Sequence, residues 1–445
     1  MQHTFSTYLP HYKATIKLGW PILIGQLGII IVGFADTLMV GRYATDSLAA
    51  ASFVNNLFTL VSLLIMGFAY GITPLISAHC SRKEYEEASL TLKNAGVSNL
   101  IFTILLLSIM GILYFFIDQM GQDAKLLPLM RPYYRIIWLS MFFVAWFNLL
   151  KQFTDGTSNT SVGMWTILSG NVLNIVGNYL FIYGKAGLPE MGLTGAGIST
   201  LLSRVWMAIL LTYILLHSSR YSIFRKGFST GQICWKNIHK ISRLSLPVSL
   251  QMGMETGSFT FSAVMAGWLG AVSLASFQIM VTIGTLGFLF YYSIGASVAI
   301  RVAAYNGIHD KTKVRYAAFA GCHILLVWAT VTSLLFYVFG IPLITLFTND
   351  PRVIATSAIL LWPLIMYQYG DAMQICFANA LRGLCDTMAM MLIAFVSYLV
   401  IGIPTGYVLG FPIGWGETGI FLAFSAGLFS ASLLFYRRFL RISRF

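Results

Sequence analysis

Charged side chains are scarce in this sequence. Only 10% of its 445 residues are Asp, Glu, Lys or Arg, whereas 57% are hydrophobic. An average soluble domain is about 25% charged. The shortage of charge therefore excludes an ordinary soluble domain, and the long apolar runs that fill the chain are typical of a polytopic membrane protein.

Cysteine is also infrequent, and its spacing matches neither a disulfide framework nor a zinc site. The five cysteines fall in apolar runs or on the side that we assign below to the cytoplasm: Cys80, Cys234, Cys322, Cys376 and Cys385. The sequence therefore predicts neither disulfides nor bound zinc.

Clustered acids are missing as well. A membrane-embedded prenyl- or phosphotransferase would need a DDxxD-like run to bind Mg²⁺, and the sequence contains none. We therefore expect no catalytic residues, no cofactor and no enzymatic activity. The net charge of +13 comes from basic residues dispersed between apolar runs, so it does not indicate binding to nucleic acid.

Runs of about 20 apolar residues predict an all-α polytopic membrane protein with twelve transmembrane helices. The runs cover residues 14–40, 48–78, 92–116, 131–151, 162–183, 195–217, 243–267, 275–302, 315–341, 355–381, 388–410 and 418–438. The residues before the first run are too polar for a signal peptide, and that run has the length of a span. We therefore expect it to be retained as a helix.

Alternate connections differ in their content of Lys and Arg. Twenty-one of the 28 basic residues fall at one side, which includes both termini and the central linker. Six fall at the other side: Arg42, Lys125, Arg131, Arg135, Lys185 and Arg352. Because the basic side of a membrane protein faces the cytoplasm, we expect both termini there, in the cytoplasmic (inner) membrane.

The two halves of the chain repeat one another. Three pairs of segments match at offsets of 224 to 227 residues: Trp20 to Phe53 with Leu246 to Ile279, Asp155-Gly156 with Arg382-Gly383, and Gly192 to Gly195 with Gly416 to Gly419. The repeat predicts two six-helix lobes, residues 1–217 and 243–445, joined by a cytoplasmic linker at 218–242. An even number of helices in each gives them parallel orientation around a central cleft.

Acids inside apolar runs are the main functional signal. Only Asp36, Glu255 and Asp371 lie there, and an ionised side chain at mid-membrane costs at least about 2.5 to 3.5 kcal/mol. Glu255 and Asp371 are each 11 or 12 residues from a basic residue at a cytoplasmic end, which predicts a shared depth of about 16 to 18 Å. Gln251 and Tyr367 each stand one turn from one of these acids. Either the acids meet in one site, or each is satisfied separately.

Asp36 shares its predicted depth with a stripe of polar side chains. Asn171, Asn174 and Asn178 have the spacing of one helix face, and Thr200 lies at the same level. Such asparagines can be purely structural, but the acid beside them favours a site where amide oxygens converge on Asp36. Arg204 could balance the charge of Asp36 or lie against carbonyls at a helix end.

These residues occur in recognisable motifs. The motifs are P-x14-D-T-x-M-V-G followed by LAAAS, QMGMETG around Glu255, YQYGDAMQ around Asp371 and ALRGLCDT downstream. With the repeat, they resemble the multidrug and toxic compound extrusion (MATE) family, in its NorM-type bacterial branch, over essentially the whole chain.

The resemblance implies a role for each group of residues. Glu255, Asp371 and Tyr367 match the family's cation site in the second lobe, where Glu255 and Asp371 would bind Na⁺. The first-lobe cluster for substrate or protons is matched by Asp36, Asn174, Asn178 and Thr200.

The function that the resemblance implies is antiport: export of organic cations, drugs and toxic compounds, coupled to Na⁺ or H⁺. The oxygen ligands that Glu255, Asp371 and Tyr367 can offer favour Na⁺ over H⁺. The expected partners are these small molecules, the coupling ion and the lipid bilayer, and we expect a monomer. The alternative is a flippase for lipid-linked precursors, which would need cationic residues along its cavity for pyrophosphate. Three intramembrane acids against one Arg favour a cationic substrate.

Overall fold

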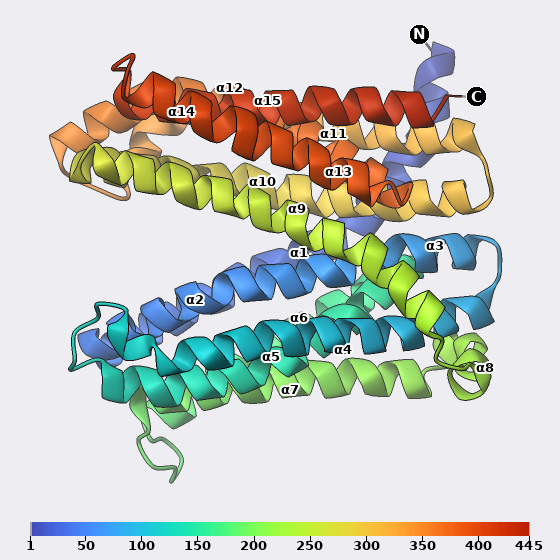
Figure 1. Cartoon of the computed structure of the whole chain (residues 1–445), viewed down its shortest axis with the longest axis horizontal. Coiled ribbons are helices and arrows are strands. Elements are labelled where there is room, and N and C mark those ends of the chain that lie inside the picture. Colours follow the sequence, from blue (N-terminus) through green and yellow to red (C-terminus); the bar gives the residue numbers. More distant parts are fainter. Residues whose placement is uncertain (1, 445) are drawn as a thin grey trace. The chain divides into compact units, whose positions relative to one another are not determined.

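The computed structural model describes residues 2–444, and these residues form helices and no strand. Contacts divide them into two compact units: Ile24–Ser249, and the segment up to Leu23 together with Leu250 onward. These units are defined by contacts between residues, whereas the predicted lobes are defined by the sequence repeat. The lobe limits of 217 and 243 therefore remain a prediction. The helices α1 (Gln2–Tyr43) and α9 (Trp235–Trp268) each have residues in both units (Figure 1).

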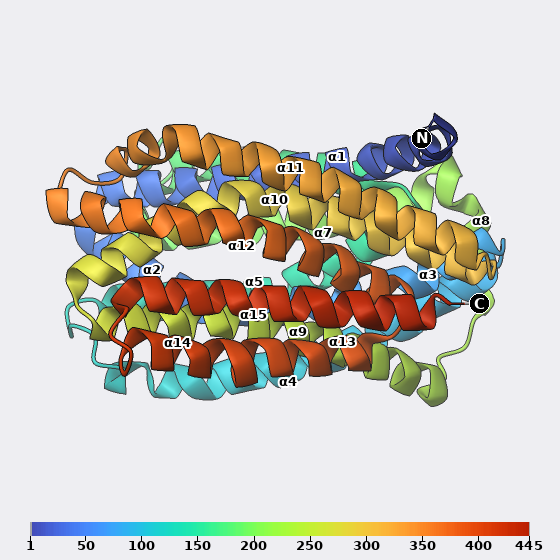
Figure 2. The same ribbon diagram turned by 90° about the horizontal axis from the view of Figure 1, so that it is seen from above.

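Long helices that run side by side build each unit (Figures 1 and 2). The unit Ile24–Ser249 also holds α2 (Thr45–Tyr70), α3 (Thr73–Ser81), α4 (Tyr85–Phe115), η1 (Ile117–Gln119), α5 (Leu127–Gly156), α6 (Thr160–Ile182), α7 (Gly192–His217), η2 (Ser219–Tyr221) and α8 (Ser222–Thr230). The other holds α10 (Ala271–Gly307), α11 (Lys311–Thr345), α12 (Pro351–Gly383), α13 (Thr387–Ala394), the π-helix η3 (Phe395–Gly402), α14 (Ile403–Gly410) and α15 (Gly416–Ile442).

The predicted all-α fold with twelve membrane helices is confirmed. Each apolar run lies within one helix of the described chain, or within one stack of consecutive helices, except that the runs 92–116 and 162–183 end one residue beyond their helices. Most of the helices extend several residues beyond the runs. Ten of these segments are long and apolar enough to cross a membrane. The other two are α6 and α9, whose hydropathy is lowered by the asparagine stripe of α6 and by polar residues such as Gln251 and Glu255 in α9.

The second membrane segment is broken between α2 and α3, although its sequence predicts one continuous helix. Gly71 stands at the break, where the backbone of α9 passes close to it. A Cβ added to Gly71 would lie 2.5 Å from Ser245 Cα. Two residues beyond the break, α3 begins with Thr73 and Pro74, and Pro74 has no N–H to continue the ladder.

The predicted linker contains a further helix, α8. Its apolar side chains explain why this polar stretch is ordered: Phe224 is buried in the core formed by α4 and α5. Ser89 Oγ donates to the Phe224 carbonyl at 2.7 Å, and Lys93 Nζ donates to the Gly231 carbonyl at 2.7 Å. The linker is therefore packed within the unit Ile24–Ser249.

The first turns of α1 are bound to the unit that contains α10. The Arg301 guanidinium of α10 is buried, and it donates to the His11 carbonyl at 2.7 Å, to Thr15 Oγ1 at 2.6 Å and to His11 Nδ1 at 2.6 Å. Tyr12 contacts His323 of α11 through a hydrogen bond of 2.9 Å. These contacts explain why the start of α1 groups with the helices after Leu250.

Candidate functional site

Three helices of the unit Ile24–Ser249 bring together the predicted polar cluster. Asp36 comes from α1, Asn174 and Asn178 from α6, and Thr200 from α7. Asn174 and Asn178 are one turn apart and buried, because their face of α6 packs on α7.

Consecutive hydrogen bonds connect these side chains in a row. Asn178 Nδ2 donates to Asp36 Oδ1 and to Asn174 Oδ1, the latter at 3.2 Å. Asn174 Nδ2 in turn donates to Thr200 Oγ1 at 3.3 Å. The amide nitrogen, rather than the expected amide oxygen, therefore faces the acid, since an ionised carboxylate only accepts. The cluster fixes Asp36 and leaves it half-buried.

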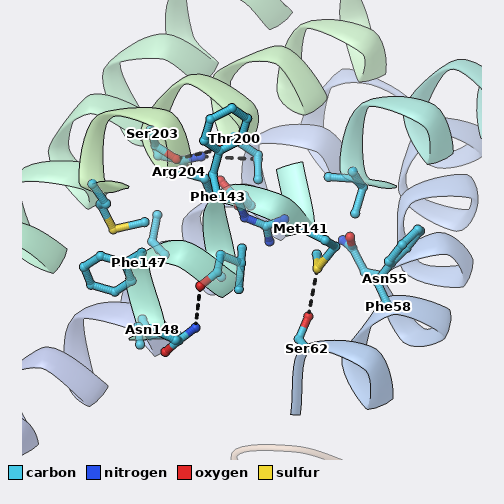
Figure 3. A pocket seen from close by; sticks show the side chains of 18 of the residues that line it. Asn55, Phe58, Ser62, Met141, Phe143, Phe147, Asn148, Thr200, Ser203 and Arg204 are labelled. Atoms are coloured by element: carbon cyan, nitrogen blue, oxygen red, sulfur yellow. Dashed lines mark hydrogen bonds between the residues drawn. The ribbon is translucent and has the colours of Figure 1, made fainter. Parts of the chain in front are cut away.

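Asp36 opens onto a cavity of about 560 Å³ within this unit. A volume of this order suits a drug-sized molecule, for which pockets are about 300 to 1,000 Å³. Figure 3 shows Thr200 and Arg204 of α7, and Asn55, Phe58 and Ser62 of α2, among the side chains that line the cavity. The rest of the wall includes the aromatic rings of Phe143 and Phe147, so the cavity combines apolar and polar surfaces.

Arg204 lies at this cavity, and of the two arrangements considered from the sequence it shows an electrostatic interaction with Asp36 rather than contacts with carbonyls at a helix end. Its Nη1 donates to Ser140 Oγ of α5 at 2.5 Å, not to carbonyls at a helix end. Among the described residues it forms no ion pair with a carboxylate. Asp36 interacts with it electrostatically, without direct contact.

The second predicted site lies in the unit that follows Leu250. Glu255 of α9 accepts two hydrogen bonds of 2.8 Å: Gln251 Nε2 donates to Oε2, and Gln374 Nε2 of α12 donates to Oε1. Both donors are neutral amides and are buried. The carboxylate of Glu255 is thus held between two helices, and no cationic side chain among the described residues donates a hydrogen bond to it.

Asp371 lies on α12 and is 1% exposed. It interacts with Tyr367, one turn before it, with Gln374 and, electrostatically, with Glu255. Its Oδ2 atom is buried and accepts no hydrogen bond from the described residues. The structure therefore brings Glu255, Asp371 and Tyr367 to one place, with a carboxylate oxygen left free to bind a cation.

Aromatic rings hold the Tyr367 side chain in this position. Its ring stacks on Phe424 with centroids 5.6 Å apart, and Phe259 and Phe421 contact it at 6.5 and 6.4 Å. Tyr367 itself is 5% exposed. The phenol can therefore keep a fixed direction toward Asp371.

Two residues of this site were missed in the sequence. Gln374 was visible as a polar residue one turn after Asp371, in the same relation as Gln251 to Glu255. Tyr398 is buried in the π-helix η3, where it interacts with Glu255 and Asp371, and its hydroxyl has no hydrogen-bond partner among described residues. No sequence signal marks a π-helix, although such segments are frequent at functional sites.

Known proteins resemble this chain over nearly its whole length. The multidrug resistance protein NorM of Vibrio parahaemolyticus is 30% identical over 434 residues, which cover 96% of this chain and 94% of that protein. The multidrug resistance protein MdtK of Photorhabdus laumondii is 28% identical over 441 residues, covering 97% and 95%.

Solved structures share the fold at lower identity. An outward-facing multidrug resistance MATE family transporter of the MOP superfamily superposes with a TM-score of 0.88 at 19% identity, covering 97% of this chain and 96% of that one. A MOP superfamily transporter from Pyrococcus furiosus gives a TM-score of 0.86 at 19% identity, with the same coverage.

The sequence profile of the MatE family matches residues 21–180 and 247–408. These two segments make up most of the chain and contain Asp36, Asn174, Asn178, Glu255, Tyr367 and Asp371, whereas Thr200 and Arg204 lie between them. The chain is a member of the MatE family of membrane transporters.

Proposed function

We propose that this chain is a multidrug exporter that moves drugs and organic cations out of the cell in exchange for a cation, Na⁺ in preference to H⁺. The names of its relatives, multidrug resistance proteins, support the export of drugs. The single observation that carries the coupling is the pair of acids Glu255 and Asp371, whose hydrogen-bonding neighbours are neutral amides and a phenol.

Two carboxylates in a low-dielectric environment strongly disfavour being ionised together. Either one binds a proton or a cation lies between them. Both outcomes give a site whose charge depends on the coupling ion. The pair therefore supports antiport, and the choice between Na⁺ and H⁺ depends on the other ligands.

Oxygen ligands favour Na⁺. Hard cations take several oxygen ligands, and Glu255, Asp371 and the Tyr367 hydroxyl supply them from α9 and α12. The unpartnered Asp371 Oδ2 and the Tyr398 hydroxyl add two oxygens for which the described chain provides no hydrogen-bond partner. H⁺ would bind to a single carboxylate oxygen, whereas Na⁺ can be coordinated by several of these oxygens at once.

The Asp36 cluster is the proposed site for the substrate, or for a proton that the substrate displaces. Asn178, Asn174 and Thr200 fix the carboxylate beside a cavity large enough for a drug. A cationic amine would neutralise Asp36, and the aromatic wall would cover flat apolar rings.

Coupling follows from exchange of positive charges. A bound coupling ion satisfies Glu255 and Asp371, and its release leaves negative charge that favours binding of a cationic drug. Each net charge that crosses the membrane adds about 2.3 kcal/mol per 100 mV. The distribution of Lys and Arg supports an inner-membrane location with both termini in the cytoplasm.

Drug flux in proteoliposomes tests the proposal. With purified chain, flux should follow an imposed Na⁺ gradient at constant pH, and both Glu255→Gln and Asp371→Asn should remove this dependence. Flux that follows a pH gradient and ignores Na⁺ would make the pair a proton site. Transport of a lipid-linked pyrophosphate in place of drugs would identify a flippase and reject drug export.

A further inference from the structure

The first turns of α9 expose a row of basic side chains. Lys236, Lys240 and Arg243 are separated by four and three residues, so they lie on one face of the helix, and all three are exposed. At about 1.5 Å per residue, the row extends over about 10 Å. Among the described residues, these three side chains form no ion pair and no hydrogen bond. We call them the α9 basic face.

Basic residues of the neighbouring helix α8 are bound by the protein itself. Lys226 Nζ forms an ion pair with Glu86 at 2.7 Å, and Arg225 Nη2 donates to the Ser218 carbonyl at 2.9 Å. The α9 basic face differs from these residues because its three positive charges have no counter-ion in the described part of the chain. It therefore presents uncompensated positive charge at the surface.

The opposite side of these turns is packed against the unit Ile24–Ser249. Ile238 and Ile241 are buried, and Ser242 Oγ forms a hydrogen bond of 2.7 Å with Ser98 Oγ of α4. Figure 1 shows this part of α9, in yellow-green, beside α8 and α4. The basic face is thus held in a fixed direction, and a ligand that binds there does not have to order the backbone.

The exposed surface changes from basic to apolar along α9. Leu246, one turn after Arg243, is 42% exposed, and Ile101, one turn after the contact of α4 with α9, is 48% exposed. At the other end of the basic face, Trp235 is 71% exposed. Tryptophan and basic residues followed by exposed apolar side chains are typical of the boundary between water and a membrane. The distribution of Lys and Arg in the whole chain assigns this boundary to the cytoplasmic side.

We propose that the α9 basic face binds the phosphate of an anionic phospholipid, whose acyl chains lie against Leu246 and Ile101. Arg243 offers two parallel N–H donors to the phosphate, and Lys240 adds a point charge. Basic residues at the cytoplasmic boundary of a membrane are attracted to anionic head groups. A second copy of the chain is a poorer occupant, because two basic faces would repel each other. The site does not depend on the export function.

Titration with short-chain lipids tests the site. Purified full-length protein in a nonionic detergent receives dioctanoyl phosphatidylglycerol, and binding is measured as the rise in Tm with lipid concentration. Dioctanoyl phosphatidylcholine has the same chains and a phosphate but no net charge, and glycerol phosphate has the phosphate without chains. We expect the phosphatidylglycerol to bind saturably and at least about tenfold more tightly than either.

A matched pair of double variants locates the site. Lys240→Gln/Arg243→Gln removes two charges of the α9 basic face and should reduce the preference for phosphatidylglycerol over phosphatidylcholine at least about fivefold. Lys125→Gln/Lys185→Gln removes two exposed charges from loops on the other side and should keep the preference. Arg243→Lys keeps the charge and should retain most of it.

Several outcomes would overturn the lipid site. These are equal affinity of the wild type for the two lipids and an unchanged preference in Lys240→Gln/Arg243→Gln. Glycerol phosphate that binds as tightly as the lipid would indicate a site for soluble phosphate, and a dimer in size-exclusion chromatography that the double variant abolishes would assign the face to a second copy. If the double variant does not fold, the wild type decides. At about 1 M NaCl, where the Debye length is about 3 Å, its preference must disappear.

Discussion

Gln374 of α12 donates a hydrogen bond of 2.8 Å to Glu255 of α9, and it also interacts with Asp371 on its own helix. One neutral amide therefore touches both acids of the proposed coupling site. Because Gln374 is 1% exposed, its side chain is held in this position by the surrounding protein.

Gln374→Ala should weaken binding of the coupling ion without abolishing its binding site. Residues that orient metal ligands typically contribute about 10- to 100-fold to affinity. We expect the Na⁺ concentration for half-maximal drug flux in proteoliposomes to rise at least about tenfold. Gln278→Ala, at an exposed position of α10, is the matched control and should leave it unchanged. An unaltered Na⁺ dependence in Gln374→Ala would reduce this glutamine to a packing residue.

Asp36→Asn should abolish export and leave a folded protein in the membrane. The asparagine keeps the shape of the side chain and removes the charge that the amine requires. Efflux of a cationic dye from cells is measured at matched expression, with Asp46→Asn in the exposed first turn of α2 as the control. Wild-type efflux from Asp36→Asn would show that its hydrogen bonds with Asn178 serve only packing.

Gly71→Ala should lower the yield of folded protein. The added Cβ would lie 2.5 Å from Ser245 Cα, a backbone atom that cannot move without shifting α9. Gly111→Ala is the control, because its Cβ would meet only Trp138 Nε1 at 4.0 Å. At such an open helical site alanine is favoured by about 0.5 to 1 kcal/mol. Size-exclusion chromatography in detergent should therefore show loss of the monodisperse peak for Gly71→Ala alone.

Arg301→Gln should destabilise the protein. Hydrogen bonds to a charged group contribute about 1.5 to 3 kcal/mol each, and Arg301 makes three. We expect a clear fall in Tm in detergent and a smaller one for Thr15→Val, which removes one acceptor. Arg352→Gln, at an exposed ion pair with Asp350, should leave Tm nearly unchanged. A Tm for Arg301→Gln equal to that of the wild type would contradict the structural role of this arginine.

The helices and the acids of the candidate sites were predictable because each has a strong local signal. Twenty apolar residues in a row leave few alternatives to a spanning helix, and a carboxylate such as Glu255 inside such a run is costly and therefore conspicuous. The pairing of Asp36 with Asn178 also followed from depth and helix spacing, although the orientation of the amide did not.

The features that the sequence did not reveal depend on contacts between distant segments. The break at Gly71 requires the close approach of Ser245, and the order of α8 requires the core that receives Phe224. Gln374 is one polar residue among many until α9 places Glu255 beside it. The side chain of Tyr398 is oriented by the π-helix η3, and no periodicity in the sequence of η3 indicates this type of helix.

The path of α1 has a consequence for the biogenesis of the protein. His11 and Thr15 leave the ribosome long before Arg301, their partner on α10. Helices that pack within Ile24–Ser249 can complete their contacts first, whereas the amino-terminal turns of α1 wait until α10 has been inserted. A fragment that begins at Leu250 would carry Arg301 without these acceptors, so we expect it to be less stable than the same helices in the whole protein.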